Sequence, residues 1–154
     1  MSANQEASTG LVRRIGWVAA PYAGGALATG IAFLLLQDSF PDKVATHFTL
    51  DGTADGYSSP ATAFGLYMLV FGIEAVATIA TGLSARTAFT TTRSLSTFST
   101  GLAAATAYIL IAAMWTTRDS DGSSPQLPLV HLLVGAVIGA AAGTAAWLIS
   151  RRRA

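Results

Sequence analysis

The sequence contains no cysteine and few charged residues. Without cysteine the chain has no disulfide, no thiol nucleophile, no covalently attached haem and no cysteine-ligated zinc. Charged residues make up 11% of the 154 residues, less than half of the roughly 25% that is typical of soluble domains. A small integral membrane protein is therefore the simplest interpretation.

Other signatures of chemistry are missing too. The sequence has no glycine-rich phosphate loop after a strand, no paired-histidine zinc helix and no G-x-S-x-G nucleophile turn. Its net charge is +1, and its longest basic run is only the three residues 151–153, so it lacks the basic surface that nucleic-acid binding requires. We expect no enzyme activity, no catalytic residues, no cofactor and no nucleic-acid partner.

Apolar residues are abundant: they make up 52% of the chain, and the mean hydropathy is +0.52. They gather in four runs, each long enough to cross a hydrocarbon core as a helix, which takes about 20 residues: residues 15–37, 58–83, 94–117 and 127–150. We predict an all-α integral membrane protein in which residues 13–154 form a single four-helix bundle. The polar residues 1–12 are expected to be a disordered cytoplasmic segment, and residues 38–57 a structured outward loop.

The charges sort by side of the membrane. Seven of the nine basic residues fall at one end of the spans: Arg13, Arg14, Arg86, Arg93, Arg151, Arg152 and Arg153. The other end carries Lys43 and Arg118 together with six aspartates: Asp38, Asp42, Asp51, Asp55, Asp119 and Asp121. Because cytoplasmic loops carry the excess of Lys and Arg, the sequence predicts that both termini lie in the cytoplasm.

Small residues recur every four positions in two of the spans. The fourth span has Gly135, Gly139 and Gly143, and the first span has Gly16, Ala20, Gly24 and Ala28. Such stripes let helix backbones come close, so spans one and four are expected to be neighbours. The stripes fit packing within one chain or a homodimer. Three tryptophans near the span boundaries are expected to anchor the protein at the membrane interfaces: Trp17, Trp115 and Trp147.

The outward loop carries most of the polar information. Alternation from Val44 to Leu50 predicts a short extended segment, and two Asp-Gly pairs predict turns. His47, Asp51 and Asp55 are spaced four residues apart and have two interpretations: ligands of a divalent metal, or turn residues that bond to nearby backbone. A recognition surface is expected from five residues of the loop: His47, Phe48, Asp51, Asp55 and Tyr57. The outward excess of aspartates favours a cationic ligand.

The loop resembles a known family. The order of Pro41, Asp42, Val44, His47, Phe48, Gly52, Asp55, Gly56, Tyr57 and Ser59 is similar to the signature of the domain of unknown function 1648, a bacterial membrane domain also found in SdpI-type immunity proteins. Two positions depart from the pattern: Ala45 stands in place of a second proline and Pro60 in place of a lysine. The resemblance implies a bacterial plasma-membrane protein whose outward loop is its distinctive part, with immunity or sensing as the implied role.

Two ionisable residues lie within the spans. Glu74 is near the middle of span two, where an ionisable side chain costs at least about 2.5 kcal/mol and usually faces a partner or a cavity. It is either part of a proton or cation path, or a structural contact with a hydroxyl of another helix. His131, at the start of span four, shares a face with Gly135 and is either part of such a path or an interfacial hydrogen bonder.

Three classes of function follow. The first is recognition of a cationic peptide or a membrane-protein partner through the outward loop. The second is a transporter or channel for ions or protons that uses Glu74. The third is a structural subunit of a membrane complex that docks through its glycine stripes. In each class the lipid bilayer is a partner.

Overall fold

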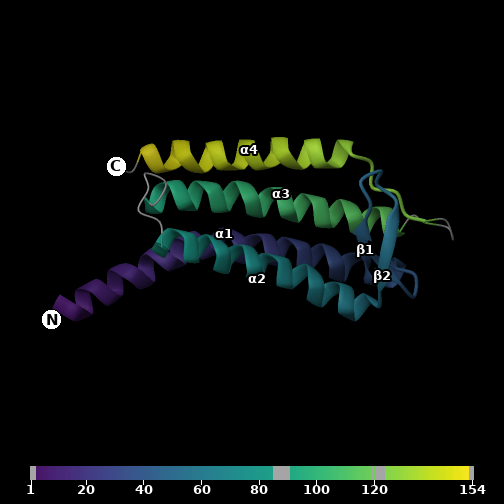
Figure 1. The fold of residues 1–154 in the computed structure, drawn as a ribbon, viewed down its shortest axis with the longest axis horizontal. Coiled ribbons are helices and arrows are strands. Elements are labelled where there is room, and N and C mark those ends of the chain that lie inside the picture. Colours follow the sequence, from purple (N-terminus) through teal and green to yellow (C-terminus); the bar gives the residue numbers. More distant parts are fainter. Residues whose placement is uncertain (1–2, 85–90, 119, 121–123, 153–154) are drawn as a thin grey trace.

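A computed structural model describes residues 3–84, 91–118, 120 and 124–152. The order of elements is α1 (Ala3–Leu36), η1 (Gln37–Ser39), β1 (Val44–Phe48), β2 (Ala54–Ser58), α2 (Pro60–Ser84), α3 (Thr92–Arg118) and α4 (Val130–Arg151). Within these residues, four helices are long and apolar enough to cross a membrane, and a small sheet sits between the first two (Figure 1). The predicted four-helix membrane protein is confirmed.

The four helices pack side by side, with α1 and α3 in the middle and α2 in contact with both of them. α3 has α4 on one side and α1 on the other, and α2 packs mainly against α1 (Figure 1). The start of α1 and the end of α4 lie at one end of the molecule, which is named the inward end below, and the strands lie at the opposite end, which is named the outward end (Figure 1). Four of the charged residues on which the predicted orientation rests lie outside the described residues: Arg86, Asp119, Asp121 and Arg153.

α4 packs chiefly on α3, so the prediction that spans one and four are neighbours is wrong. A Cβ atom added to Gly139 would lie 2.7 Å from the carbonyl oxygen of Gly101 on α3, and one added to Gly143 would lie 3.3 Å from that of Thr97. The glycine stripe of α4 is therefore used within the chain. The stripe of α1 faces away from the other helices, because Cβ atoms added at Gly16 and Gly24 would have nothing within 4 Å.

The structure differs from the sequence expectation at the start of α1. The helix begins at Ala3, so residues 3–12 are helical where their polarity predicts disorder. Alanine, glutamine and glutamate favour helix, and the hydroxyls of Ser8 and Thr9 donate to the carbonyl of Gln5 at 2.9 and 2.8 Å. This first part of α1 extends beyond the other helices (Figure 1). The first span thus continues beyond its apolar residues as a helix, because each further residue adds one hydrogen bond to a helix that already exists.

The core anchors the small sheet to the helices. At the outward end, the fully buried Val44 of β1 packs into a cluster of residues from three helices. The helical residues are Phe33 and Leu36 of α1, Ala63 and Tyr67 of α2, and Met114 of α3. Apolar side chains on the outer faces of the helices stay exposed, among them Leu35 of α1 and Val137 of α4. In a membrane protein these faces contact lipid. Because Val44 belongs to the cluster that joins the helices, the sheet and the spans share one core.

Candidate functional site

β1 and β2 form an antiparallel hairpin with irregular register. His47 stands opposite Gly56, with register shifts on either side of the histidine. A Cβ atom at Gly56 would lie 2.7 Å from the Cβ of His47, so glycine is required where the two strands meet. The hairpin turn places Gly52 at φ 86°, a left-handed conformation that favours glycine.

Hydrogen bonds hold the hairpin at two places: on α2 and on the connection before α4. The hydroxyl of Tyr67 on α2 donates to the carbonyl of Ala45 at 3.0 Å. Residues 125–127 run beside the turn: the N–H of Ala54 donates to the carbonyl of Pro125 at 3.0 Å, and the N–H of Leu127 donates to that of Gly52 at 2.8 Å. The outward end is therefore a cap built from two segments that are distant in sequence.

Sequence reasoning missed this second segment, because it places residues 127–129 inside span four. α4 begins only at Val130. The signal was the pair Pro125 and Pro128, since proline removes a backbone donor and interrupts a helix. Gln126 adds a side-chain bond, donating from Nε2 to Oγ1 of Thr53 at 3.1 Å.

The structure brings two of the three candidate metal ligands together. His47 Nδ1 and Asp55 Oδ1 are 2.5 Å apart, and the two side chains are 71% and 47% exposed. Asp51 bonds within its own turn instead, accepting from the hydroxyl of Thr49 and from the N–H of Thr53 at 3.1 Å. These bonds, with that from Thr49 the largest effect, hold the pKa of Asp51 below its ordinary value of 3.8.

The geometry therefore favours the turn-residue interpretation for Asp51. In the described part of the chain, no three His, Asp or Glu side chains come close enough to share a metal ion. His47 and Asp55 form a cross-strand pair, which ties β1 to β2 at the exposed face.

The outward surface also has a groove. Its volume is about 540 Å³, and it is lined by residues of three segments: Pro41, Asp42, Lys43, Tyr57, Ser120, Ser124 and Pro125. Of the predicted recognition residues, Tyr57 lines the groove, and its hydroxyl donates to the carbonyl of Ala54 at 3.2 Å. Asp55 and Tyr57 are both exposed on β2.

Phe48 does not belong to this surface. It is half-buried and packs against the cluster that contains Leu127, so it attaches the hairpin to the residues before α4. Four groove residues were not among the recognition residues predicted from the sequence: Asp42, Lys43, Ser120 and Ser124. Asp42 and Lys43 were visible as polar neighbours of Pro41, but nothing local predicts that Ser120, Ser124 and Pro125 line the same groove.

The electrostatics of the outward end are acidic. Four aspartates are exposed in the described residues, and three of them belong to the hairpin or the groove: Asp42, Asp51 and Asp55. Lys43 offsets one of them. Arg118 lies over the ring of Trp115, with its Cζ 4.2 Å from the centroid. A cationic ligand would meet a favourable field here.

Comparison with known families agrees with the resemblance in the loop. Residues 24–71 match the model of the family described as domain of unknown function (DUF1648). The matched residues are 24–36 of α1, η1, the hairpin and 60–71 of α2. No curated protein and no solved structure gives a significant match to the chain.

Glu74 lies just beyond the DUF1648 segment. Its Oε1 accepts a hydrogen bond from the hydroxyl of Thr106 on α3 at 2.6 Å, one of the partners that the sequence suggests. Its Oε2 is buried and has no hydrogen-bond partner among the described residues. Two other hydroxyls of the spans, those of Tyr22 on α1 and Thr78 on α2, bond to each other at 2.7 Å.

His131 also lies outside the DUF1648 segment, near the start of α4. Its Nδ1 is 2.9 Å from the hydroxyl of Tyr108 on α3, and the two rings lie 5.9 Å apart. It therefore joins α4 to α3 close to the outward cap, as an interfacial hydrogen bonder does.

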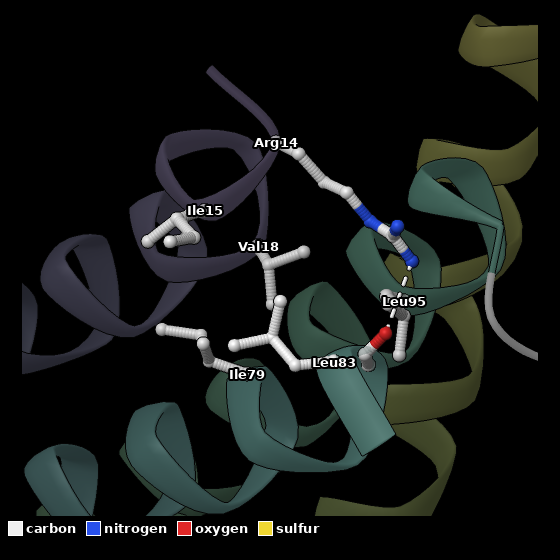
Figure 2. Close-up of a pocket in the computed structure, with 7 residues that line it drawn as sticks. Arg14, Ile15, Val18, Ile79, Leu83 and Leu95 are labelled. Atoms are coloured by element: carbon white, nitrogen blue, oxygen red, sulfur yellow. Dashed lines mark hydrogen bonds between the residues drawn. The ribbon is translucent and has the colours of Figure 1, made fainter. Parts of the chain in front are cut away.

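The inward end has a narrow apolar crevice between α1, α2 and α3. Figure 2 shows Arg14 reaching from α1 over this crevice, where its Nη2 donates to the carbonyl of Gly82 on α2 at 3.2 Å. The crevice has a volume of about 10 Å³, which holds at most one water molecule. It is a packing feature, and the ligand-sized surface is at the outward end.

Proposed function

We propose that the protein acts in the bacterial plasma membrane, with both termini in the cytoplasm, and that its outward groove recognises a cationic peptide in an SdpI-like immunity or sensing role. The observation that carries the proposal is the groove of about 540 Å³ on a cap that the membrane core holds in place. The orientation rests on the distribution of arginines.

The lining of the groove fits a peptide. Pro41, Tyr57 and Pro125 supply apolar walls, and the serines and Asp42 supply hydrogen-bond acceptors. Tyr57 is 42% exposed, so its ring is free to contact a side chain of the ligand. Aromatic residues are enriched where peptides and proteins bind. The neighbouring carboxylates of Asp51 and Asp55 attract basic groups.

The test combines binding and protection. The protein in nanodiscs is titrated with fluorescent cationic membrane-active peptides, and cells that express it are challenged with the same peptides. Asp42→Asn should weaken binding about two- to fivefold, as expected for one exposed charge pair, and Tyr57→Ala should weaken it further. Asp38→Asn is the matched control, because Asp38 is an exposed aspartate outside the groove.

The outcomes separate clearly. Parallel loss of binding and of cell survival in the groove variants would support the proposal. Equal behaviour of Asp42→Asn and Asp38→Asn would show that the groove has no special role. A His47→Ala/Asp55→Ala variant tests whether the cross-strand pair contributes to the same surface.

We propose, as a second candidate, that Glu74 carries protons or cations across the membrane. The specific observation is its buried Oε2 without a hydrogen-bond partner in the described residues, since buried polar atoms are usually satisfied. A water molecule or a cation would complete it. Thr106 holds the other oxygen and would keep the carboxylate in place during transport.

A flux assay in proteoliposomes tests this candidate. Glu74→Gln keeps an acceptor for Thr106 but cannot exchange a proton in the same way, so it should abolish pH-driven flux while the fold persists. Thr106→Val is the control for a purely structural contact, since it removes the hydrogen bond and keeps the carboxylate. Wild-type flux in Glu74→Gln would exclude Glu74 as the carrier.

A further inference from the structure

Two arginines share one tryptophan at the inward end of α3 and α4. The Cζ of Arg93 lies 5.5 Å from the ring centroid of Trp147, and that of Arg151 lies 4.5 Å from it. Arg93 also donates from Nη2 to the carbonyl oxygen of Trp147 at 3.3 Å. The contact follows from the glycine stripe, because Gly143 brings α4 against Thr97, one turn of α3 from Arg93.

Among the described residues, no acidic side chain forms an ion pair with Arg93 or Arg151. In the part of the chain that the structure describes, the one ion pair joins His47 and Asp55 at the opposite end. The Nε of Arg93 is buried and has no hydrogen-bond partner among those residues. Two guanidinium groups around one ring repel each other, and the repulsion is strong where water is scarce. An anion with several oxygens would relieve it and accept from both groups.

The surroundings indicate what kind of anion. Trp147 is 41% exposed, and its neighbours Leu148 and Ile149 are 48% and 55% exposed. The cluster thus stands at the end of a spanning helix, with apolar surface beside it and an indole at the depth of the headgroups. An anion that carries acyl chains fits both parts of this surface.

We propose that Arg93, Trp147 and Arg151 form a site for the headgroup of an anionic phospholipid of the inward leaflet. The phosphate lies between the two guanidinium groups, and the acyl chains lie along the exposed face of α4. Basic clusters between spanning helices at the cytoplasmic side recognise anionic headgroups in this way. The site is independent of the outward groove and of Glu74.

The experiment measures lipid preference beside a single tryptophan. A Trp17→Phe/Trp115→Phe protein keeps only Trp147 and is placed in nanodiscs that contain brominated phosphatidylglycerol or brominated phosphatidylcholine, each of which quenches a nearby indole. The Trp147 reporter should favour the anionic lipid by up to about 25-fold, since each of the two nearby arginines contributes about a fivefold preference. Arg93→Gln/Arg151→Gln should reduce the preference to that of a neutral surface.

The outward end supplies an internal control that needs no change in the arginines. A Trp17→Phe/Trp147→Phe protein keeps Trp115, which has the single arginine Arg118 over its ring and should report a weaker preference. Arg93→Lys/Arg151→Lys keeps the charges and should retain most of the preference at Trp147. If the lysine variant lost the preference as completely as the glutamine variant, the cause would be misfolding rather than the lost charges.

Three outcomes would overturn the proposal. Equal quenching of the Trp147 reporter by the two lipids would show that the site has no headgroup preference. An unchanged preference in the glutamine variant would place its cause elsewhere. Loss of the preference on addition of inorganic phosphate would show that the site takes a free anion rather than a lipid.

Discussion

The replacement Gly52→Ala tests whether the outward cap is built as described. Gly52 has φ 86°, where an alanine costs about 1–2 kcal/mol. Its Cβ would also lie 2.3 Å from the carbonyl oxygen of Leu127, a backbone atom that cannot rotate away. The segment before α4 must then move, and the hydrogen bond from the N–H of Leu127 to the carbonyl of Gly52 is lost.

The magnitude follows from these terms. One or two lost hydrogen bonds contribute about 0.5–1.5 kcal/mol each, so the cap should be destabilised by about 2–4 kcal/mol together with the backbone strain. In amide hydrogen exchange of the protein in nanodiscs, residues 44–58 and 124–127 should lose roughly 30- to 700-fold of their protection. Protection in the middle of α3 should stay unchanged.

Two further variants separate the causes. Gly52→Asn relieves much of the strain, because asparagine tolerates the left-handed conformation, yet it keeps the clash with Leu127 and should still open the cap. Gly16→Ala is the control, since a Cβ there meets nothing within 4 Å. Unchanged exchange in Gly52→Ala, or equal exchange in Gly52→Ala and Gly16→Ala, would refute the reasoning.

Three other changes test the fold. Gly139→Ala should lower the free energy of unfolding in micelles by about 1–3 kcal/mol through overpacking against α3, whereas Gly24→Ala, which meets open space, should not. Tyr67→Phe removes the donor to the carbonyl of Ala45 and should raise exchange of β1 amides by the equivalent of about 1 kcal/mol. Because the pKa of Asp51 is lowered in the folded state, its contribution is present above its ordinary value of 3.8 and is lost as pH falls through the lower folded value. Amide exchange of the hairpin, corrected for the pH dependence of the intrinsic exchange rate, should show protection falling as the pH is lowered. Asp51→Asn should abolish this pH dependence.

The helices were predictable because lipid leaves the backbone few choices. Their ends were less so. The fourth span starts at Val130 rather than at residue 127, since Pro128 and the pairing with the hairpin keep the preceding residues extended. The first helix starts at Ala3, because helix propagation outweighs the polarity on which the expectation of disorder depends.

The neighbours of the helices were harder to predict than their positions. A glycine stripe shows that a backbone comes close, but it does not name the partner. The complementary surface on α3 is formed by Thr97, Gly101 and Ala105, also spaced by four residues, and these contact the stripe of α4. This third stripe of small residues favours α3 over α1 as the neighbour of α4.

The candidate site was predictable in part for the same kind of reason. The loop sequence shows the turns, the exposed His47 and the aspartates, because these depend on local chemistry. The groove depends on Pro125 and Gln126 lying against the hairpin, which is a tertiary contact between residues 73 positions apart in the sequence. The pairing of His47 with Asp55 rather than with Asp51 likewise depends on the strand register.

The same construction makes ligand recognition depend on residues that do not line the groove. Tyr57 and Pro125 stand on different segments, and the bonds at Gly52 and Ala54 hold those segments together. A preformed groove binds without the cost of ordering its walls. Gly52→Ala should therefore weaken binding of the cationic peptide, although Gly52 is not among the lining residues. If the peptide bound this variant as tightly as the wild type while its cap amides exchanged faster, the recognition surface would have to lie elsewhere on the outward end.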